Sequence, residues 1–174
     1  MRMFKGVLVL GIAGALLAGC GANDGDKAAE QPDAVTTASI VNEGDAFVQA
    51  VGEDGTWIVA VLNDVAIGEE VVVSGEFRDK GAADGKIYRK IALYAQDEDH
   101  NITASYTLTV PKLTVRSENL RIQGGTVKGD VYVEANGFSL HESATIDGNI
   151  VFASEDAKAS AVLDGTVTGT AGVQ

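Results

Sequence analysis

The acidic run Asp97-Glu-Asp99-His-Asn101 has the residue types and spacing of the first half of a calcium-binding loop. Such a loop also needs a glycine at its sixth position and a bidentate glutamate at its twelfth, so that oxygen atoms surround the ion. Ile102 stands where the glycine belongs, and Leu108 stands where the glutamate belongs. We therefore predict a polar turn between two strands instead of a metal site, and we predict no cofactor.

The two histidines are the other residues that metal or acid–base chemistry would use. Neither His100 nor His141 has a second histidine or a cysteine at ligand spacing, which argues against zinc. His141 is followed by Glu142 and Ser143, but no strand–nucleophile–helix motif surrounds this serine. We interpret these three residues as part of a turn.

A third candidate for catalysis is a set of basic side chains that lie close in sequence to two acids. The set comprises Lys112, Arg116, Arg121 and Lys128, with Glu118 and Asp130 nearby. A basic residue beside acids can abstract a proton, so a small polysaccharide-processing enzyme is one alternative. The chain is too short to stack the many coils from which such enzymes build a substrate groove. We predict that the protein is not an enzyme, and we name no catalytic residue.

Aromatic side chains are candidates for stacking against sugar rings. Trp57 precedes the aliphatic residues 58–62, so we predict that it lies in the core. Tyr132 alternates with Val131 and Val133, so in a strand it would face outward. We single out Tyr132 as the candidate exposed binding residue of an envelope-binding or glycan-binding module, which is the first alternative function.

The beginning of the chain has the features of an export signal. Arg2 and Lys5 provide a positive start, the uncharged residues 6–17 are mostly apolar, and small residues precede Cys20. The apolar stretch is shorter than the roughly 20 residues that a membrane-spanning helix needs. We predict a signal peptide over residues 1–19.

The end of this signal, Leu17-Ala-Gly-Cys20, resembles the lipobox of bacterial lipoproteins. In that family the cysteine thiol is acylated with diacylglycerol and the signal is cut before it. The resemblance implies that Cys20 is a lipid attachment site, that a bilayer is a partner, and that the protein is extracytoplasmic on a bacterial membrane. Several acyl chains together anchor a protein stably. Cys20 is the only cysteine, so the chain cannot form an internal disulfide.

Composition divides the remaining chain and limits its partners. Residues 20–39 are small, polar and charged, and we predict that they form a flexible tether. The rest reads as a single domain, with a β-rich N-terminal region at 40–107 and a repetitive region at 108–170. The formal net charge of −12 argues against a nucleic-acid partner, because such a surface repels phosphates.

One helix and five strands are predicted before the repetitive region ends. The helix should span residues 43–51 and end at Gly52. Strands should span 57–62, 70–77, 86–95, 102–110 and 112–122, where Val, Ile, Thr and Tyr are frequent. We interpret Lys86, Arg89 and Lys90 as a solvated basic face that lies opposite Asp97–Asp99 across a hairpin.

The C-terminal region repeats an aliphatic–x–Gly–x–aliphatic phrase. Gly129, Gly148 and Gly169 fall 19 and 21 residues apart, a period typical of stacked repeats. A β-solenoid would place a glycine at each corner and stack aliphatic residues inside. The expected inner pairs are Val127 on Ile146, Val131 on Ile150 and Val133 on Phe152, with Phe138 and Leu140 starting a return wall that Ala161 and Leu163 repeat. A β-sandwich remains the alternative.

This tract resembles the polymer-forming domain of bactofilins. The matching residues are Val127-Lys-Gly129-Asp130-Val131 and Ala144-Thr-Ile146-Asp-Gly148-Asn149-Ile150. The resemblance implies a short right-handed parallel β-helix that assembles end to end. The sequence thus predicts a mainly β, membrane-anchored surface lipoprotein with a structural, scaffold or assembly role, whose partners are the bilayer and either a second copy or cell-wall glycan. Open solenoid ends invite such stacking, and the predicted helix could cap one of them.

Overall fold

The computed structural model describes residues 39–174, and strands dominate this region of the chain. The predicted signal peptide, Cys20 and all but the last residue of the predicted tether lie outside the described residues. Among residues 39–174, no helix is both long and apolar enough to cross a membrane.

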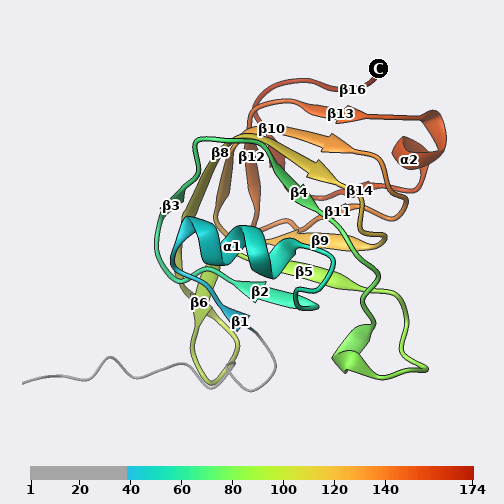
Figure 1. The fold of residues 1–174 in the computed structure, drawn as a ribbon. Coiled ribbons are helices and arrows are strands. Elements are labelled where there is room, and N and C mark those ends of the chain that lie inside the picture. Colours follow the sequence, from blue (N-terminus) through green and yellow to red (C-terminus); the bar gives the residue numbers. More distant parts are fainter. Residues whose placement is uncertain (1–38) are drawn as a thin grey trace, which may run out of the picture. The chain divides into compact units, whose positions relative to one another are not determined.

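One of the two main sheets consists of six short strands that are spaced at intervals along the chain (Figure 1). Its strands, in spatial order, are β1 (Ser39–Ile40), β2 (Ile58–Ala60), β5 (Arg89–Ala92), β9 (Leu120–Gln123), β11 (Ser139–Leu140) and β14 (Val162–Leu163). All neighbours are parallel, and their spatial order is their order in the chain. Because parallel neighbours cannot be joined by a tight turn, the chain must leave this sheet between each pair.

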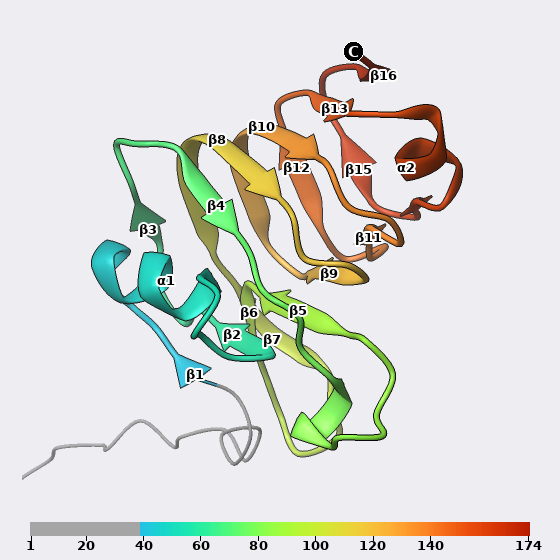
Figure 2. The ribbon, with the colours of Figure 1, turned by 45° about the vertical axis from the view of Figure 1, so that its right-hand side comes forward.

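The chain leaves into an eight-stranded sheet that is also parallel throughout. Its strands are β3 (Val65–Ala66), β4 (Val71–Val73), β8 (Thr107–Val115), β10 (Thr126–Val133), β12 (Thr145–Asp147), β13 (Ile150–Phe152), β15 (Thr166–Val167) and β16 (Ala171–Val173). From β2 onward, each visit to the first sheet is followed by a visit to the second (Figure 2). The prediction of a mainly β chain is confirmed, and its two main sheets are parallel.

The pairing of β10 with β12 and β13 has the predicted register. Val127 pairs with Ile146, Val131 with Ile150 and Val133 with Phe152, and all six side chains are fully buried. Leu140 pairs with Leu163 on the opposite sheet, again as predicted. The outward positions also stack, with a row of threonines formed by Thr107, Thr126, Thr145 and Thr166. An aliphatic interior and a polar exterior therefore continue from strand to strand.

Glycine is required where the chain turns within β10 and between β12 and β13. Gly129 has a φ of 141°, and a Cβ atom there would overlap the carbonyl oxygen of Val110. A Cβ atom on Gly148 would overlap the carbonyl oxygen of Gly129. These backbones stack too closely for any side chain. Pro111, which lacks an N–H group, lies where the pairing of β8 with β10 is irregular.

Two helices and a hairpin lie outside the sheets. Helix α1 (Gly44–Val51) ends at Gly52 as predicted and buries Phe47, Ala50 and Val51 against β2 and β4. Helix α2 (Glu155–Ala159) was not predicted, although Ser154 caps it through its hydroxyl and acidic residues occupy its first turn. Strands β6 (Tyr94–Gln96) and β7 (Ile102–Ser105) form the antiparallel hairpin, and η2 (Asp79–Gly81) is a single 3-10 turn.

Several predicted strand boundaries were wrong. The single strand expected at 86–95 is two strands, β5 and β6, and the second leaves the sheet to form the hairpin. The strands expected at 102–110 and 112–122 are three strands: β7 and β9 form their outer parts, and the long strand β8 runs through Pro111 between them without a break. Proline is tolerated there because the parallel ladder is already interrupted opposite Gly129.

Candidate functional site

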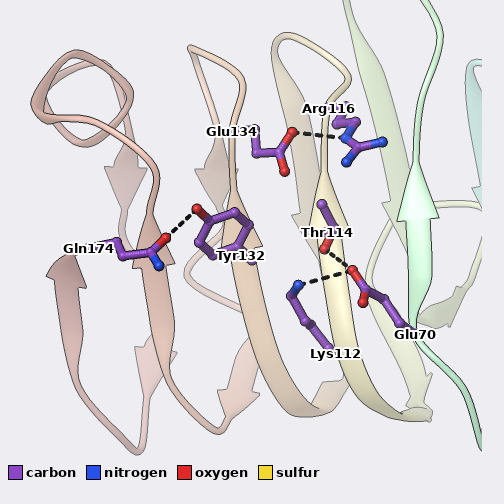
Figure 3. A network of polar contacts seen from close by, with 7 residues as sticks. All are labelled: Glu70, Lys112, Thr114, Arg116, Tyr132, Glu134 and Gln174. Atoms are coloured by element: carbon purple, nitrogen blue, oxygen red, sulfur yellow. Dashed lines mark hydrogen bonds and ion pairs between the residues drawn. The ribbon is translucent and has the colours of Figure 1, made fainter.

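Tyr132, the predicted binding residue, lies on the outer face of the eight-stranded sheet, as its alternation with buried valines predicted. It pairs with Thr114 of β8 on one side and Val151 of β13 on the other. Its hydroxyl donates a hydrogen bond to Oε1 of Gln174 at 2.6 Å, and the Lys112 ammonium lies 5.0 Å from its ring centroid (Figure 3). The side chain is half-buried, because these contacts occupy its edge and some of its face.

Ion pairs continue this polar row toward β4 (Figure 3). The Glu70 carboxylate accepts a hydrogen bond from the Thr114 hydroxyl at 2.6 Å and pairs with the Lys112 ammonium at 3.0 Å. Nearby, Nε of Arg116 donates to the Glu134 carboxylate at 2.8 Å. These side chains come from segments up to 44 residues apart and join neighbouring strands. Each acidic side chain in this row forms an ion pair with a basic one, and exposed ion pairs contribute about 0–1 kcal/mol each.

The contacts of Glu70 lower the pKa of its carboxyl, first through the Thr114 hydroxyl and then through Lys112. We expect Thr114→Val and Lys112→Ala each to raise this pKa toward its ordinary value. The lowered pKa means that the carboxylate stabilises the fold above its unfolded-state pKa and loses that effect as the pH falls through its folded-state value. Side-chain NMR titration measures the shift. Arg116→Ala, which keeps both direct contacts, should change it least, and a larger effect from that variant would contradict the assignment.

The basic residues considered for catalysis do not form a cluster. Lys112 and Arg116 lie on the outer face of the eight-stranded sheet and pair with acids other than those expected. Arg121 belongs to β9 of the six-stranded sheet, and Lys128 is exposed in the first half of β10. Asp130 instead accepts hydrogen bonds from the backbone and side-chain amide of Asn149.

This last contact belongs to a polar ladder at the corner between β12 and β13. The Asp130 carboxylate holds Asn149, and Oδ1 of Asn149 accepts hydrogen bonds from the backbone and hydroxyl of Thr170. Each residue lies beside the next at the same corner of successive repeats. The ladder satisfies backbone groups that the turns leave unpaired, which is a structural task.

Arg89 lies inside the molecule, contrary to the prediction from the sequence. Predicted to be solvated, it is only 1% exposed, because it lies on the inner side of β5 together with Ile91 and Leu93. Its guanidinium donates to the carbonyl oxygens of Thr56, Ser74, Ala50 and Gly52 and to the Ser117 hydroxyl. It also lies 4.0 Å from the ring centroid of Phe77. Burial lowers the pKa of Arg89 to about 10, so the group stays charged at neutral pH.

The expected pairing of Lys86, Arg89 and Lys90 with Asp97–Asp99 is absent from residues 39–174. Lys86 is exposed, and the Lys90 ammonium donates a hydrogen bond to the Tyr94 hydroxyl at 2.8 Å. Trp57 was also misplaced. It precedes β2 and is only partly buried, with its ring centroid 6.2 Å from that of Tyr88.

The turns predicted from the acidic run and from His141 are present. The Asp97 carboxylate accepts hydrogen bonds from the backbone N–H groups of Asp99 and Asn101, and so closes the β6–β7 hairpin. These bonds, above all those from Asn101, lower the pKa of Asp97. Nδ1 of His141 lies 2.7 Å from the Ser143 hydroxyl within one turn. Within the described residues, no group of three His, Cys, Asp or Glu side chains could hold a metal ion.

The last three strands form an edge of both sheets. Within residues 39–174, β14, β15 and β16 each pair with one strand only, on their N-terminal side. Val162 and Leu163 of β14 are 49% and 37% exposed, unlike the other aliphatic residues of the six-stranded sheet. Residues 161–174 contain one charged side chain, Asp164. This edge therefore exposes unpaired backbone groups and apolar side chains in a nearly uncharged setting.

Comparison with known protein families, with curated proteins and with solved structures finds no match for this chain.

Proposed function

We propose that this chain is a lipid-anchored structural protein of a bacterial envelope, and that its residues 39–174 form a short right-handed β-helix that associates with a second copy through β14, β15 and β16. The anchor is the acylated Cys20, which the lipobox-like sequence Leu17-Ala-Gly-Cys20 supports. The observation that carries the assembly role is the unpaired, nearly uncharged edge formed by the last three strands.

The β-helix proposal is supported by the order and direction of the strands. Every neighbour in the two main sheets is parallel, and the chain alternates between the sheets in a fixed order. A helical path of this kind places the same position of each repeat in one inner ladder, as in the row Leu113, Val131 and Ile150. Stacked repeats contact only their neighbours, so the first and last repeats need caps.

The first and the last strands of the two sheets differ in whether another element covers them. At the end near β1, α1 covers the core with Phe47, Ala50 and Val51, all of them buried. At the β14–β16 end, aliphatic side chains and backbone groups face outward. An exposed edge of this kind favours pairing with another edge. At the β1 end, β1, β3 and β4 also pair with one strand each, but α1 packs against β2 and β4 there. Association through the β14–β16 end, which no such helix covers in the described region of the chain, therefore gives closed pairs and not a filament.

A second copy is a suitable partner for this edge because the chain as a whole is acidic. With a net charge of −12, two copies repel each other over most of their surfaces. Residues 161–174, with Asp164 as their one charged side chain, let two copies approach with the least repulsion. Two-fold symmetry then places the same edge on both sides of the interface.

Cross-linking of the full-length chain in bacterial membranes tests the proposal. If Cys20 is acylated, a cysteine introduced by Val162→Cys is the only free thiol, and a short bis-maleimide should link two copies into a dimer. Val48→Cys, on an exposed position of α1 at the other end, is the matched control and should remain monomeric. Equal dimer yields from the two variants, or none from Val162→Cys, would refute the interface. The unmodified chain should incorporate labelled palmitate and Cys20→Ser should not; equal labelling of the two, or none of the unmodified chain, would refute the anchor.

A further inference from the structure

A depression in the surface lies beside Trp57, the residue that precedes β2. Its volume is about 440 Å³, and its lining includes Thr56, Trp57, Glu76, Phe77, Arg78 and Ala82. A volume of this order is typical of small-molecule sites, which combine apolar walls with a few polar groups. None of these residues belongs to the edge through which we propose that two copies associate, so the two features are independent.

Aromatic residues form the apolar side of the depression. Trp57 is partly exposed, and its ring is supported from one side by Tyr88 at a tilt of 57°. One face of the Phe77 ring is covered by the buried Arg89 guanidinium, which fixes that ring in place. An amphipathic ring held at the surface by such contacts offers a flat apolar area at little entropic cost.

A guanidinium and a carboxylate form the polar side. Nη2 of Arg78 pairs with Oε1 of Glu76 at 2.7 Å, and Nη1 of Arg78 donates to the Gly85 carbonyl oxygen at 3.0 Å. These contacts hold the planar guanidinium in one orientation. A guanidinium has five N–H donors and a carboxylate has two acceptor oxygens, so the pair keeps both donors and acceptors for a ligand. The two side chains are 39% and 61% exposed, which leaves them accessible.

The rim of the depression is ordered by its own backbone hydrogen bonds. Asp79 donates to the Lys86 carbonyl oxygen, Gly85 donates to that of Ala82, and Tyr88 donates to that of Phe77. The loop from 79 to 88 is thus closed on itself and holds Arg78 and Phe77 at its base. A site ordered before binding loses less entropy when a ligand arrives.

We infer that this depression binds a sugar unit of a neutral glycan. A pyranose ring has an apolar C–H face, which can stack on Trp57. Its hydroxyl groups can accept hydrogen bonds from the Arg78 guanidinium and donate hydrogen bonds to the Glu76 carboxylate. The net charge of −12 disfavours polyanionic glycans. The inference goes beyond the proposed assembly role, and it places glycan binding at Trp57 and not at Tyr132, whose hydroxyl is engaged by Gln174.

Trp57 provides the test, because it is the only tryptophan of the chain. Titration of the full-length protein in detergent with a tetramer of N-acetylglucosamine, a tetramer of glucose and an acidic tetramer of galacturonate should change the tryptophan fluorescence. We expect a saturable change with at least one neutral tetramer, with a dissociation constant of about 1 mM or tighter, and a weaker response to the acidic one. No saturable response to either neutral sugar would overturn the inference, as would tighter binding of the acidic one.

Matched variants locate the binding. Glu76→Gln and Arg78→Met should each weaken binding about tenfold, since each removes a charge-assisted hydrogen bond. Tyr132→Ala, on the other sheet, should leave the affinity unchanged. Trp57→Ala removes the fluorescent reporter, so its binding is measured by calorimetry after circular dichroism has established that the variant is folded. Unchanged affinity in Trp57→Ala, or an equal loss in Tyr132→Ala, would place the sugar elsewhere.

Discussion

Replacement of Arg89 by methionine is expected to lower the free energy of unfolding by about 3–5 kcal/mol. The guanidinium makes hydrogen bonds to five acceptors that come from four separate segments of the chain. Methionine fills a similar space but donates no hydrogen bond. The Ala50 and Gly52 carbonyl oxygens each keep a backbone N–H donor, from Thr56 and Gly55. The Thr56 and Ser74 carbonyl oxygens lose their donor, and each acceptor left without a partner costs about 1–3 kcal/mol, reduced where water can reach it.

The position of Arg89 explains why this loss should exceed that of an ordinary buried polar residue. Two of its acceptors, the Ala50 and Gly52 carbonyl oxygens, lie at the C-terminal end of α1, where a positive charge also interacts favourably with the helix dipole. The Ser74 carbonyl oxygen follows β4, and the Ser117 hydroxyl follows β8. Through these hydrogen bonds, Arg89 connects the end of α1 to the residues that follow β4 and β8.

Equilibrium unfolding in urea, followed by far-ultraviolet circular dichroism, measures the effect. Arg78→Met is the matched control, because Arg78 has the same side chain in the neighbouring loop but makes an exposed ion pair, and its loss should cost about 0–1 kcal/mol. Arg89→Lys should fall between the two, since an ammonium cannot reach acceptors spread around a planar fork. Equal midpoints for Arg89→Met and Arg78→Met would show that the buried network contributes nothing.

The same residue shows what the sequence could and could not predict. Arg89, Ile91 and Leu93 are every second residue, and Ile91 and Leu93 are fully buried. The two-residue period of a strand therefore predicted that the Arg89 side chain points inward. Its charge favoured the opposite interpretation, because a buried arginine needs partners that the local sequence does not reveal. Those partners are up to 39 residues away, at the end of α1 and in loops, and their proximity depends on the completed fold.

Prediction succeeded where successive repeats align without insertions. β10 and residues 145–152 match position by position, so the register of their buried pairs could be derived from the sequence. Between residues 57 and 107 the period is broken by the η2 loop and by the β6–β7 hairpin. These insertions add residues between equivalent strands, and the repeat is then hidden from any search at a fixed period.

For the candidate site, the alternation of β10 predicted the outward direction of Tyr132 but none of its contacts. Gln174 is 42 residues away, and Lys112 belongs to the adjacent strand β8. The corner glycines are a different case, because their spacing both revealed the repeat and identified positions where no side chain fits. They provide the second large expected effect.

Gly129→Ala is expected to lower the free energy of unfolding by about 3 kcal/mol. Two costs combine at this position. A φ of 141° is a backbone conformation that residues with a Cβ atom rarely adopt, and the added methyl group would overlap the Val110 carbonyl oxygen of the preceding repeat. Because that oxygen belongs to the backbone of a stacked strand, relief requires β8 and β10 to separate locally.

Gly172→Ala in β16 is the control that separates these costs from a general preference for alanine or glycine in strands. It adds the same methyl group within a strand, but no atom lies within 4 Å of the new Cβ position. We expect its stability to stay within about 0.5 kcal/mol of the unmodified chain. Because β16 belongs to the proposed interface, both variants are unfolded thermally at a concentration at which the chain is monomeric. If Gly129→Ala unfolds at the same temperature as Gly172→Ala, close stacking at the corners is not what sets the spacing of the repeats. If it unfolds well below, the glycine period first visible in the sequence is a packing requirement, because each repeat leaves room at its corner only for the backbone of the next.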